Sequence, residues 1–123
     1  MKLCINSRDE LTLVELNEVA CFQADGNYTN VSYMGGQQTV VSLGLSKMEA
    51  LISAAYPKGK ASPFVRLGRS LLINQGYLCQ IDVQKQRIVL SDFRKFKVNI
   101  SVTKPLLKAF KNFISQQYKA SKD

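Results

Sequence analysis

Short strand-like runs separated by turn residues constrain the fold of this chain more than any other feature. Runs of β-prone residues recur along most of the 123 residues, and Gly, Asn, Asp and Pro stand between many of them. We expect strands at residues 11–16, 18–24, 28–34, 37–42, 64–67, 70–73, 77–83, 87–91 and 94–102. In the last run apolar residues alternate with Lys, Asn and Ser, which predicts a strand with one core face and one basic face. The pattern predicts a mainly β chain.

Two segments have helical periodicity instead. Apolar side chains recur at helical spacing over residues 45–56, where Ser46 and Glu49 have capping-box spacing and Pro57 ends the helix. A second helix follows Thr103, its expected N-cap, and closes the chain. One stripe of this helix consists of Leu106, Phe110, Phe113, Ile114 and Gln117, and another of Lys104, Lys108 and Lys111.

Composition excludes most enzyme classes. The chain has no His and no paired carboxylates for acid and base catalysis, so we expect no catalytic residues, no metal and no cofactor. Cys4, Cys21 and Cys79 are too far apart for a metal-binding clip, and we interpret them as small buried hydrophobic residues. The first ten residues turn polar before a signal sequence could form, and no apolar stretch approaches the roughly 20 residues of a membrane span. We therefore expect a cytoplasmic protein.

Positive charge is concentrated in the second half of the chain. The formal net charge is +8, but residues 1–61 carry five basic and six acidic side chains, whereas residues 62–123 carry twelve and three. Such an uneven field favours a polyanionic partner, with nucleic acid ahead of an anionic membrane. A basic face that serves only solubility is the alternative at this point.

Three segments, taken in order, carry a family resemblance. Residues 19–29 run through a Gly-Asn-Tyr turn, residues 64–74 read Phe-Val-Arg-Leu-Gly-Arg-Ser-Leu-Leu-Ile-Asn, and residues 100–104 precede the last helix. Together they resemble the LytTR-type DNA-binding domain of bacterial response regulators, whose signature for the second segment is Phe-x-Arg-x-His-Arg-Ser-Tyr-x-Val-Asn. The chain departs from the family at Gly68, Leu71 and Thr103-Lys104, where members commonly have His, Tyr and Ser-Arg. The resemblance covers about residues 8–118 and identifies a single domain over residues 1–123, without a receiver domain.

The resemblance implies an elongated β-sandwich of short stacked sheets, with one internal helix and a C-terminal helix, that contacts DNA through loops. By position, it suggests base contacts from Asn27, Tyr28, Thr29, Arg69 and Lys104, and phosphate contacts from Arg66 and Ser70. Lys108 and Lys111 would act by charge alone. For Asn27 a purely conformational role, and for Tyr28 packing at the sheet edge, remain open alternatives.

The leading hypothesis is a transcriptional regulator that binds double-stranded DNA sequence-specifically through the major groove. We expect a monomer in solution that occupies paired direct repeats as two copies, controlled by its abundance or by a regulatory partner protein. An RNA or general polyanion binder is one alternative, and a protein- or membrane-interaction module on the same fold is the other.

Overall fold

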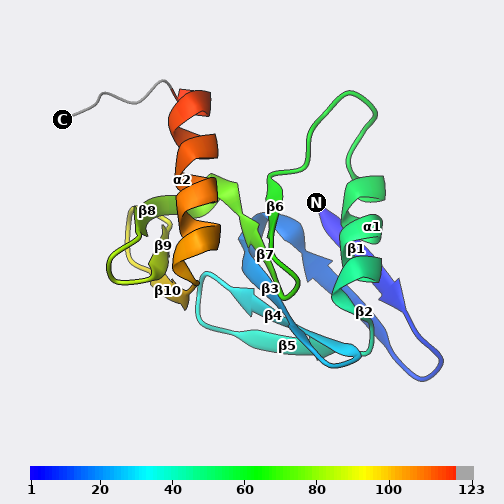
Figure 1. The fold of residues 1–123 in the computed structure, drawn as a ribbon. Helices are drawn as coiled ribbons and strands as arrows, with labels where there is room; N and C mark the ends of the chain where they lie inside the picture. Colours follow the sequence, from blue (N-terminus) through cyan, green and yellow to red (C-terminus); the bar gives the residue numbers. More distant parts are fainter. Residues whose placement is uncertain (119–123) are drawn as a thin grey trace. The chain divides into compact units, whose positions relative to one another are not determined.

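The computed structural model describes residues 1–118 and divides into two compact units, Met1–Tyr77 and Leu78–Asp123 (Figure 1). Each unit has its own antiparallel pairing and its own helix. The expectation of one domain over residues 1–123 stays a prediction, and its last five residues lie outside the described part.

The first unit holds two antiparallel sheets and the helix α1. A two-stranded sheet pairs β1 (Lys2–Asn6) with β2 (Leu11–Glu15), so the first residues form a strand rather than an arm. A five-stranded sheet has the order β5-β4-β3-β7-β6. Its strands are β3 (Val19–Asp25), β4 (Tyr28–Tyr33), β5 (Gln38–Val41), β6 (Phe64–Leu67) and β7 (Leu71–Asn74), and α1 spans Leu45–Ala55. Short 3₁₀ helices occupy Leu16–Glu18 and Gln75–Tyr77.

The core of this unit lies between the sheets and one face of α1. The buried side chains of α1 are Leu45, Met48 and Ile52, whose spacing follows the helical period, and they belong to the same cluster as Phe22. Phe22 meets the ring of Phe64 edge to face, with ring centroids 5.3 Å apart. This packing fixes the first turn of α1 beside the five-stranded sheet.

The second unit holds a three-stranded sheet and the helix α2. The strand order is β10-β9-β8, with β8 at Leu78–Asp82, β9 at Arg87–Ser91 and β10 at Lys97–Ser101. The helix α2 spans Lys104–Tyr118 and begins where the Thr103 carbonyl accepts a hydrogen bond from the Leu107 amide. A mainly β fold with three small antiparallel sheets, an internal helix and a C-terminal helix is confirmed.

Several local expectations are wrong. The strand predicted at 94–102 begins only at Lys97, because the Asp92 carboxylate binds the backbone of the preceding segment into a loop. The buried residues of α2 are Leu107 and Phe110, whereas Leu106 and Phe113 from the predicted stripe are exposed. The three cysteines also differ from the interpretation as buried residues, since only Cys21 is buried and Cys4 and Cys79 are exposed.

The capping box expected at the start of α1 is not formed. Gly44 is the N-cap and makes no side-chain hydrogen bond, while Ser46 already lies inside the helix. Glu49 therefore has no helix end to cap, and its carboxylate binds Arg66 instead. No helix in the described residues is long and apolar enough to cross a membrane.

Candidate nucleic-acid interface

Three loops of the first unit meet at one end of the five-stranded sheet. The β3–β4 turn follows Asp25, the β6–β7 turn consists of residues 68–70, and the β5–α1 loop follows Val41. Strand pairing brings them together, because β3 lies between β4 and β7 in the sheet. The Ala24 amide donates a hydrogen bond of 2.8 Å to the Ser70 carbonyl, which joins the first two loops directly.

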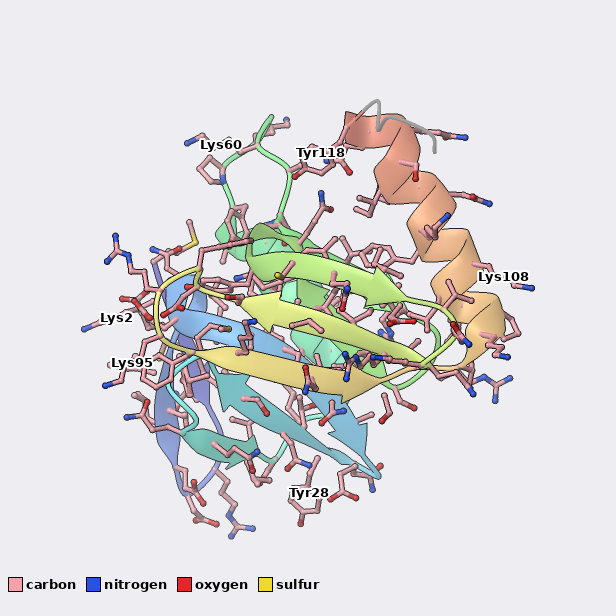
Figure 2. All side chains as sticks on the ribbon, turned by 90° about the vertical axis from the view of Figure 1, so that its left-hand side faces the viewer. Lys2, Tyr28, Lys60, Lys95, Lys108 and Tyr118 are labelled. Carbon is pink, nitrogen blue, oxygen red and sulfur yellow. The ribbon has the colours of Figure 1, made fainter. Side chains whose placement is uncertain are left out.

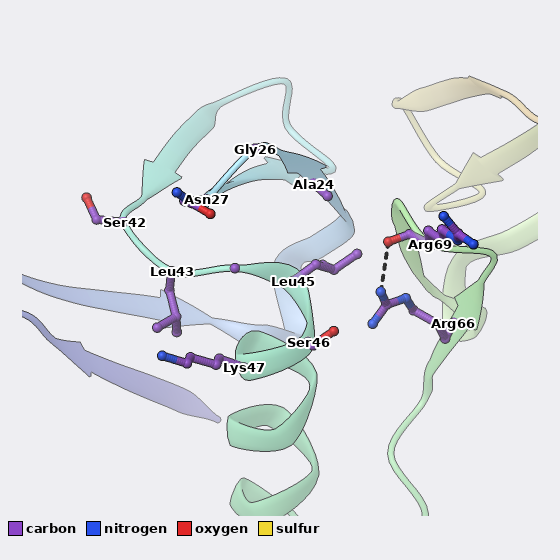
Figure 3. Close-up of a pocket in the computed structure, with 11 residues that line it drawn as sticks. Ala24, Gly26, Asn27, Ser42, Leu43, Leu45, Ser46, Lys47, Arg66 and Arg69 are labelled. Carbon is purple, nitrogen blue, oxygen red and sulfur yellow. Dashed lines mark hydrogen bonds between the residues drawn. The ribbon is translucent and has the colours of Figure 1, made fainter.

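A hollow of about 510 Å³ lies between these loops and the first turn of α1 (Figure 3). Its cationic side chains are Lys47, Arg66 and Arg69, and none of the described residues that line it is acidic. The lining residues are Ala24, Gly26, Asn27, Ser42, Leu43, Gly44, Leu45, Ser46, Lys47, Arg66 and Arg69. The hollow is thus a positively charged recess built from backbone turns.

Arg66 holds the β6–β7 turn in place. Its Nη1 donates to Glu49 Oε1 at 2.8 Å, its Nη2 donates to the Arg69 carbonyl at 2.8 Å, and its Nε donates to the Gly68 carbonyl at 3.1 Å. Figure 3 shows the bond from Arg66 to the Arg69 carbonyl. All three guanidinium nitrogens are therefore engaged within the protein. Arg66 therefore supports the turn, and because its guanidinium keeps two further N–H groups, the phosphate contact expected from the sequence stays a prediction.

Arg69 stands at the centre of that turn with its side chain exposed. Among the described residues, no hydrogen bond or ion pair holds its guanidinium, although its backbone carbonyl is held by Arg66. Gly68 before it has φ +66, a conformation that glycine adopts without steric cost. Ser70 after it is also exposed. The turn therefore presents one long cationic side chain on a fixed backbone.

The three candidate residues at the β3–β4 turn differ in exposure. Gly26, with φ +60, is the residue of this turn in the left-handed conformation, and Asn27 does not adopt it. The side chains of Asn27 and Tyr28 are both exposed. Tyr28 lies at the end of the hairpin, with its ring away from the sheet (Figure 2). Thr29 is fully buried, and its hydroxyl donates a 2.7 Å hydrogen bond to the Leu43 carbonyl. The expected base contact by the Thr29 side chain is incompatible with this burial; Thr29 ties the turn to the β5–α1 loop.

The remaining candidates lie along α2 in the second unit. Lys104, Lys108 and Lys111 are all exposed, and their spacing of four and three residues places them on one stripe of the helix. Figure 2 shows Lys108 pointing outward from the helix. Such lysines offer charge without a fixed geometry.

Two further residues, Asn74 and Lys47, belong to this end of the first unit. Asn74 ties down the backbone: its Nδ2 donates to the Val19 carbonyl and its Oδ1 accepts from the Gly76 amide, both at 2.9 Å. Lys47 was not predicted as a site residue. Its position in the first turn of a helix that follows a strand end was the available signal.

Comparisons with known proteins agree with this architecture. The sequence model of the LytTr DNA-binding domain family matches residues 9–115. A solved structure described as the LytTr DNA-binding domain of a methyl-accepting/DNA response regulator from Bacillus cereus is 19% identical, with a TM-score of 0.58 over 92% of this chain and 95% of that one. A search of curated proteins found no match. The family is one of DNA-binding domains rather than of enzymes, and the resemblance seen in the sequence is confirmed. With the match covering most of its length, the chain belongs to the LytTR family of DNA-binding domains.

Proposed function

We propose that this LytTR domain is a cytoplasmic transcriptional regulator that binds double-stranded DNA sequence-specifically and reads the major groove through the loops around Arg69. The observation that carries the proposal is the exposed Arg69 guanidinium on a turn whose backbone is clamped by Arg66. A guanidinium fork matches the two acceptors of a guanine edge, and a fixed backbone limits the entropy lost on binding.

The other exposed side chains of the loops complete the proposed contacts. Asn27 presents an amide that suits an adenine edge, and Tyr28 contacts the sugar or the methyl group of a thymine. Ser70 and Lys47 bind phosphates beside Arg69. Lys104, Lys108 and Lys111 add contacts to phosphates by charge alone. Because Thr29 is buried and Arg66 is engaged, we assign both to support of the loops.

Selection of bound sequences from random duplex DNA, followed by affinity measurement, tests the proposal. We expect a defined motif that binds at least about 1,000-fold more tightly than a scrambled duplex at physiological salt. Selection that yields no motif contradicts sequence specificity. Single strands that bind as tightly as the duplex would favour the general polyanion binder.

Two single variants distinguish base reading from charge. Arg69→Ala should weaken binding to the selected site by about 1–3 kcal/mol and relax the preference at one base pair. Lys108→Ala should weaken selected and scrambled duplexes alike and lower the salt slope by about one. An equal loss on both duplexes for Arg69→Ala would make Arg69 a phosphate contact instead.

We further propose that two copies bind paired direct repeats about one helical turn apart, while the free protein is monomeric. A single small module covers only about 600–1,000 Å² of DNA-facing surface, which is little for selecting one promoter in a genome. Inserting half a turn of spacer between the repeats should abolish tight binding, and inserting a full turn should partly restore it. Binding that is indifferent to the spacer, or a stable dimer without DNA, contradicts this assembly.

A further inference from the structure

The loop between β9 and β10, residues 92–96, exposes two aromatic rings that the DNA-binding proposal does not use. Phe93 is 71% exposed and Phe96 is 39% exposed, and both Arg94 and Lys95 between them are exposed. The loop lies at the end of the three-stranded sheet where β10 begins, whereas Lys104 follows the other end of β10. Two exposed rings within five residues form a local apolar patch, and such patches are typical of interaction sites.

Hydrogen bonds hold this loop in one conformation. One carboxylate oxygen of Asp92 accepts from the amides of Arg94, Lys95 and Phe96 at 2.9, 2.9 and 3.0 Å. The amides of Arg94 and Phe96 are the main cause of a pKa of Asp92 below its ordinary value. The Phe93 amide donates to Ser91 Oγ at 2.9 Å. The loop is thus preorganised, and a partner would lose little entropy in ordering it.

The backbone at Phe93 is strained, yet its ring is left in solvent. Phe93 has φ +59, a region that costs a bulky side chain about 1–2 kcal/mol. Burial of the ring does not compensate for this strain, because most of the ring is exposed. Stability alone would favour glycine or asparagine at this position.

A hollow of about 470 Å³ adjoins the loop and gives it the form of a small docking site. It is lined by Cys79, Ser91, Phe93, Arg94, Lys95, Phe96 and Lys97, all from the second unit. Three of these residues are cations, and Figure 2 shows the Lys95 side chain projecting outward. The one acid of the loop, Asp92, stays ionised with one carboxylate oxygen bound to backbone amides, and three cations against this one acid leave a net charge of 3 − 1 = +2. An apolar centre with a cationic rim results, which is complementary to an acidic segment that carries an apolar side chain.

We propose that the 92–96 loop docks an acidic segment of a partner protein. An apolar side chain of that segment occupies the hollow against Phe93, and its carboxylates pair with Arg94, Lys95 and Lys97. Single-stranded nucleic acid fits less well, because it binds through several successive stacking rings. Here the Lys95 ammonium lies 5.5 Å from the centroid of the Phe96 ring, which covers one face of that ring. The inference is independent of how the first unit contacts DNA.

Titration of the ¹⁵N-labelled full chain with three probes tests this inference by amide chemical shifts. The probes are the capped peptide Glu-Asp-Leu-Phe-Asp-Glu, the same peptide with Ser at both apolar positions, and an eight-nucleotide oligo-dT. We expect the first peptide to shift the amides of residues 92–97 and Cys79 saturably, and the serine peptide to bind at least about fivefold more weakly. No saturable shift in the loop, or tighter binding of oligo-dT at the same amides, overturns the proposal.

Three variants complete the test. Phe93→Gly removes the ring and leaves a residue suited to positive φ, and it should weaken the first peptide about tenfold. The double change Arg94→Gln and Lys95→Gln tests the rim if the first variant does not fold, and it should weaken the peptide by a similar factor. Phe113→Ala, which removes another exposed ring of the same unit, is the matched control and should leave binding unchanged. Unchanged binding in both loop variants, or an equal loss in the control, overturns the proposal.

Discussion

The replacement Glu49→Gln tests whether α1 controls the turn that carries Arg69. The carboxylate accepts from Arg66 Nη1 at 2.8 Å, and Arg66 in turn binds the carbonyls of Gly68 and Arg69. Glutamine keeps an oxygen acceptor of nearly the same size and position. The change therefore removes the charge that pairs with the guanidinium and little else.

The exposure of the pair sets the expected magnitude for folding. The side chains of Arg66 and Glu49 are 25% and 41% exposed, so water screens part of their attraction. Partly exposed pairs contribute about 0.2–1 kcal/mol, and the two further bonds of Arg66 place this pair in the upper half of that range. We expect Glu49→Gln to lower the free energy of unfolding by about 0.5–1 kcal/mol and the Tm by about 2–5 °C.

The effect on DNA binding should have opposite signs for selected and scrambled duplexes. A looser turn makes Arg69 lose more entropy on binding its base, so affinity for the selected duplex should fall about three- to tenfold. Affinity for scrambled DNA should rise slightly, because the chain becomes one unit more positive. Simple removal of a repulsive charge near DNA would instead strengthen both.

Fluorescence anisotropy at fixed salt with both duplexes measures these signs, and Glu10→Gln is the matched control. Glu10 is an exposed acid of the same unit, and its replacement makes the same change in net charge without touching Arg66. The control should bind both duplexes slightly more tightly. If Glu49→Gln and Glu10→Gln have the same effect on both duplexes, the Glu49–Arg66 pair has no part in positioning Arg69.

Two further predictions concern thiol reactivity and acid pH. With a thiol reagent at pH 8, the exposed Cys4 and Cys79 should react at once, whereas Cys21 should react only on unfolding, because burial raises the pKa of its thiol to about 11; rapid reaction of all three thiols would contradict the structure. The hydrogen bonds to Asp92 lower its folded pKa, so the order they give to residues 94–96 should persist above the ordinary Asp value and be lost as pH falls through the lower folded pKa. Amide shifts of those residues should titrate with a midpoint below about pH 3.9, and a midpoint at or above that value would count against the hydrogen-bonded loop.

The hairpins could be predicted from the sequence because their signals are local. Alternating apolar residues and a Gly-Asn turn determine β3 and β4 within about fifteen residues of chain, and the strand bounds of β6 and β9 agree with the prediction. The exposure of Arg69 was also predictable, since no acid near it in sequence could pair with it. The family signature then placed these hairpins in order.

Contacts between distant residues could not be predicted in the same way. Glu49 has the spacing of a capping box in α1, but its partner Arg66 is 17 residues away on the strand β6. Thr29 follows two exposed residues, and only the pairing of β4 with β5 shows that its hydroxyl meets the Leu43 carbonyl. The alternation of residues 94–102 is typical of one long strand. The Asp92 carboxylate, however, accepts hydrogen bonds from three amides of this segment, so the strand begins only at Lys97.

The hydrogen bonds of Arg66 and the glycine at position 68 leave Arg69 as the side chain of the β6–β7 turn that we propose to contact a base. Family members commonly have His where this chain has Gly68, and a glycine offers no side chain to a base. The φ of +66 at Gly68 suits the residue present and would strain a histidine by about 1–2 kcal/mol. With Arg66 bound to the backbone of the turn and Gly68 without a side chain, Arg69 is the long side chain that this turn offers for the proposed base contact. We therefore propose that a further base contact at this end of the sheet comes from the neighbouring β3–β4 turn, which presents Asn27 at the same hollow.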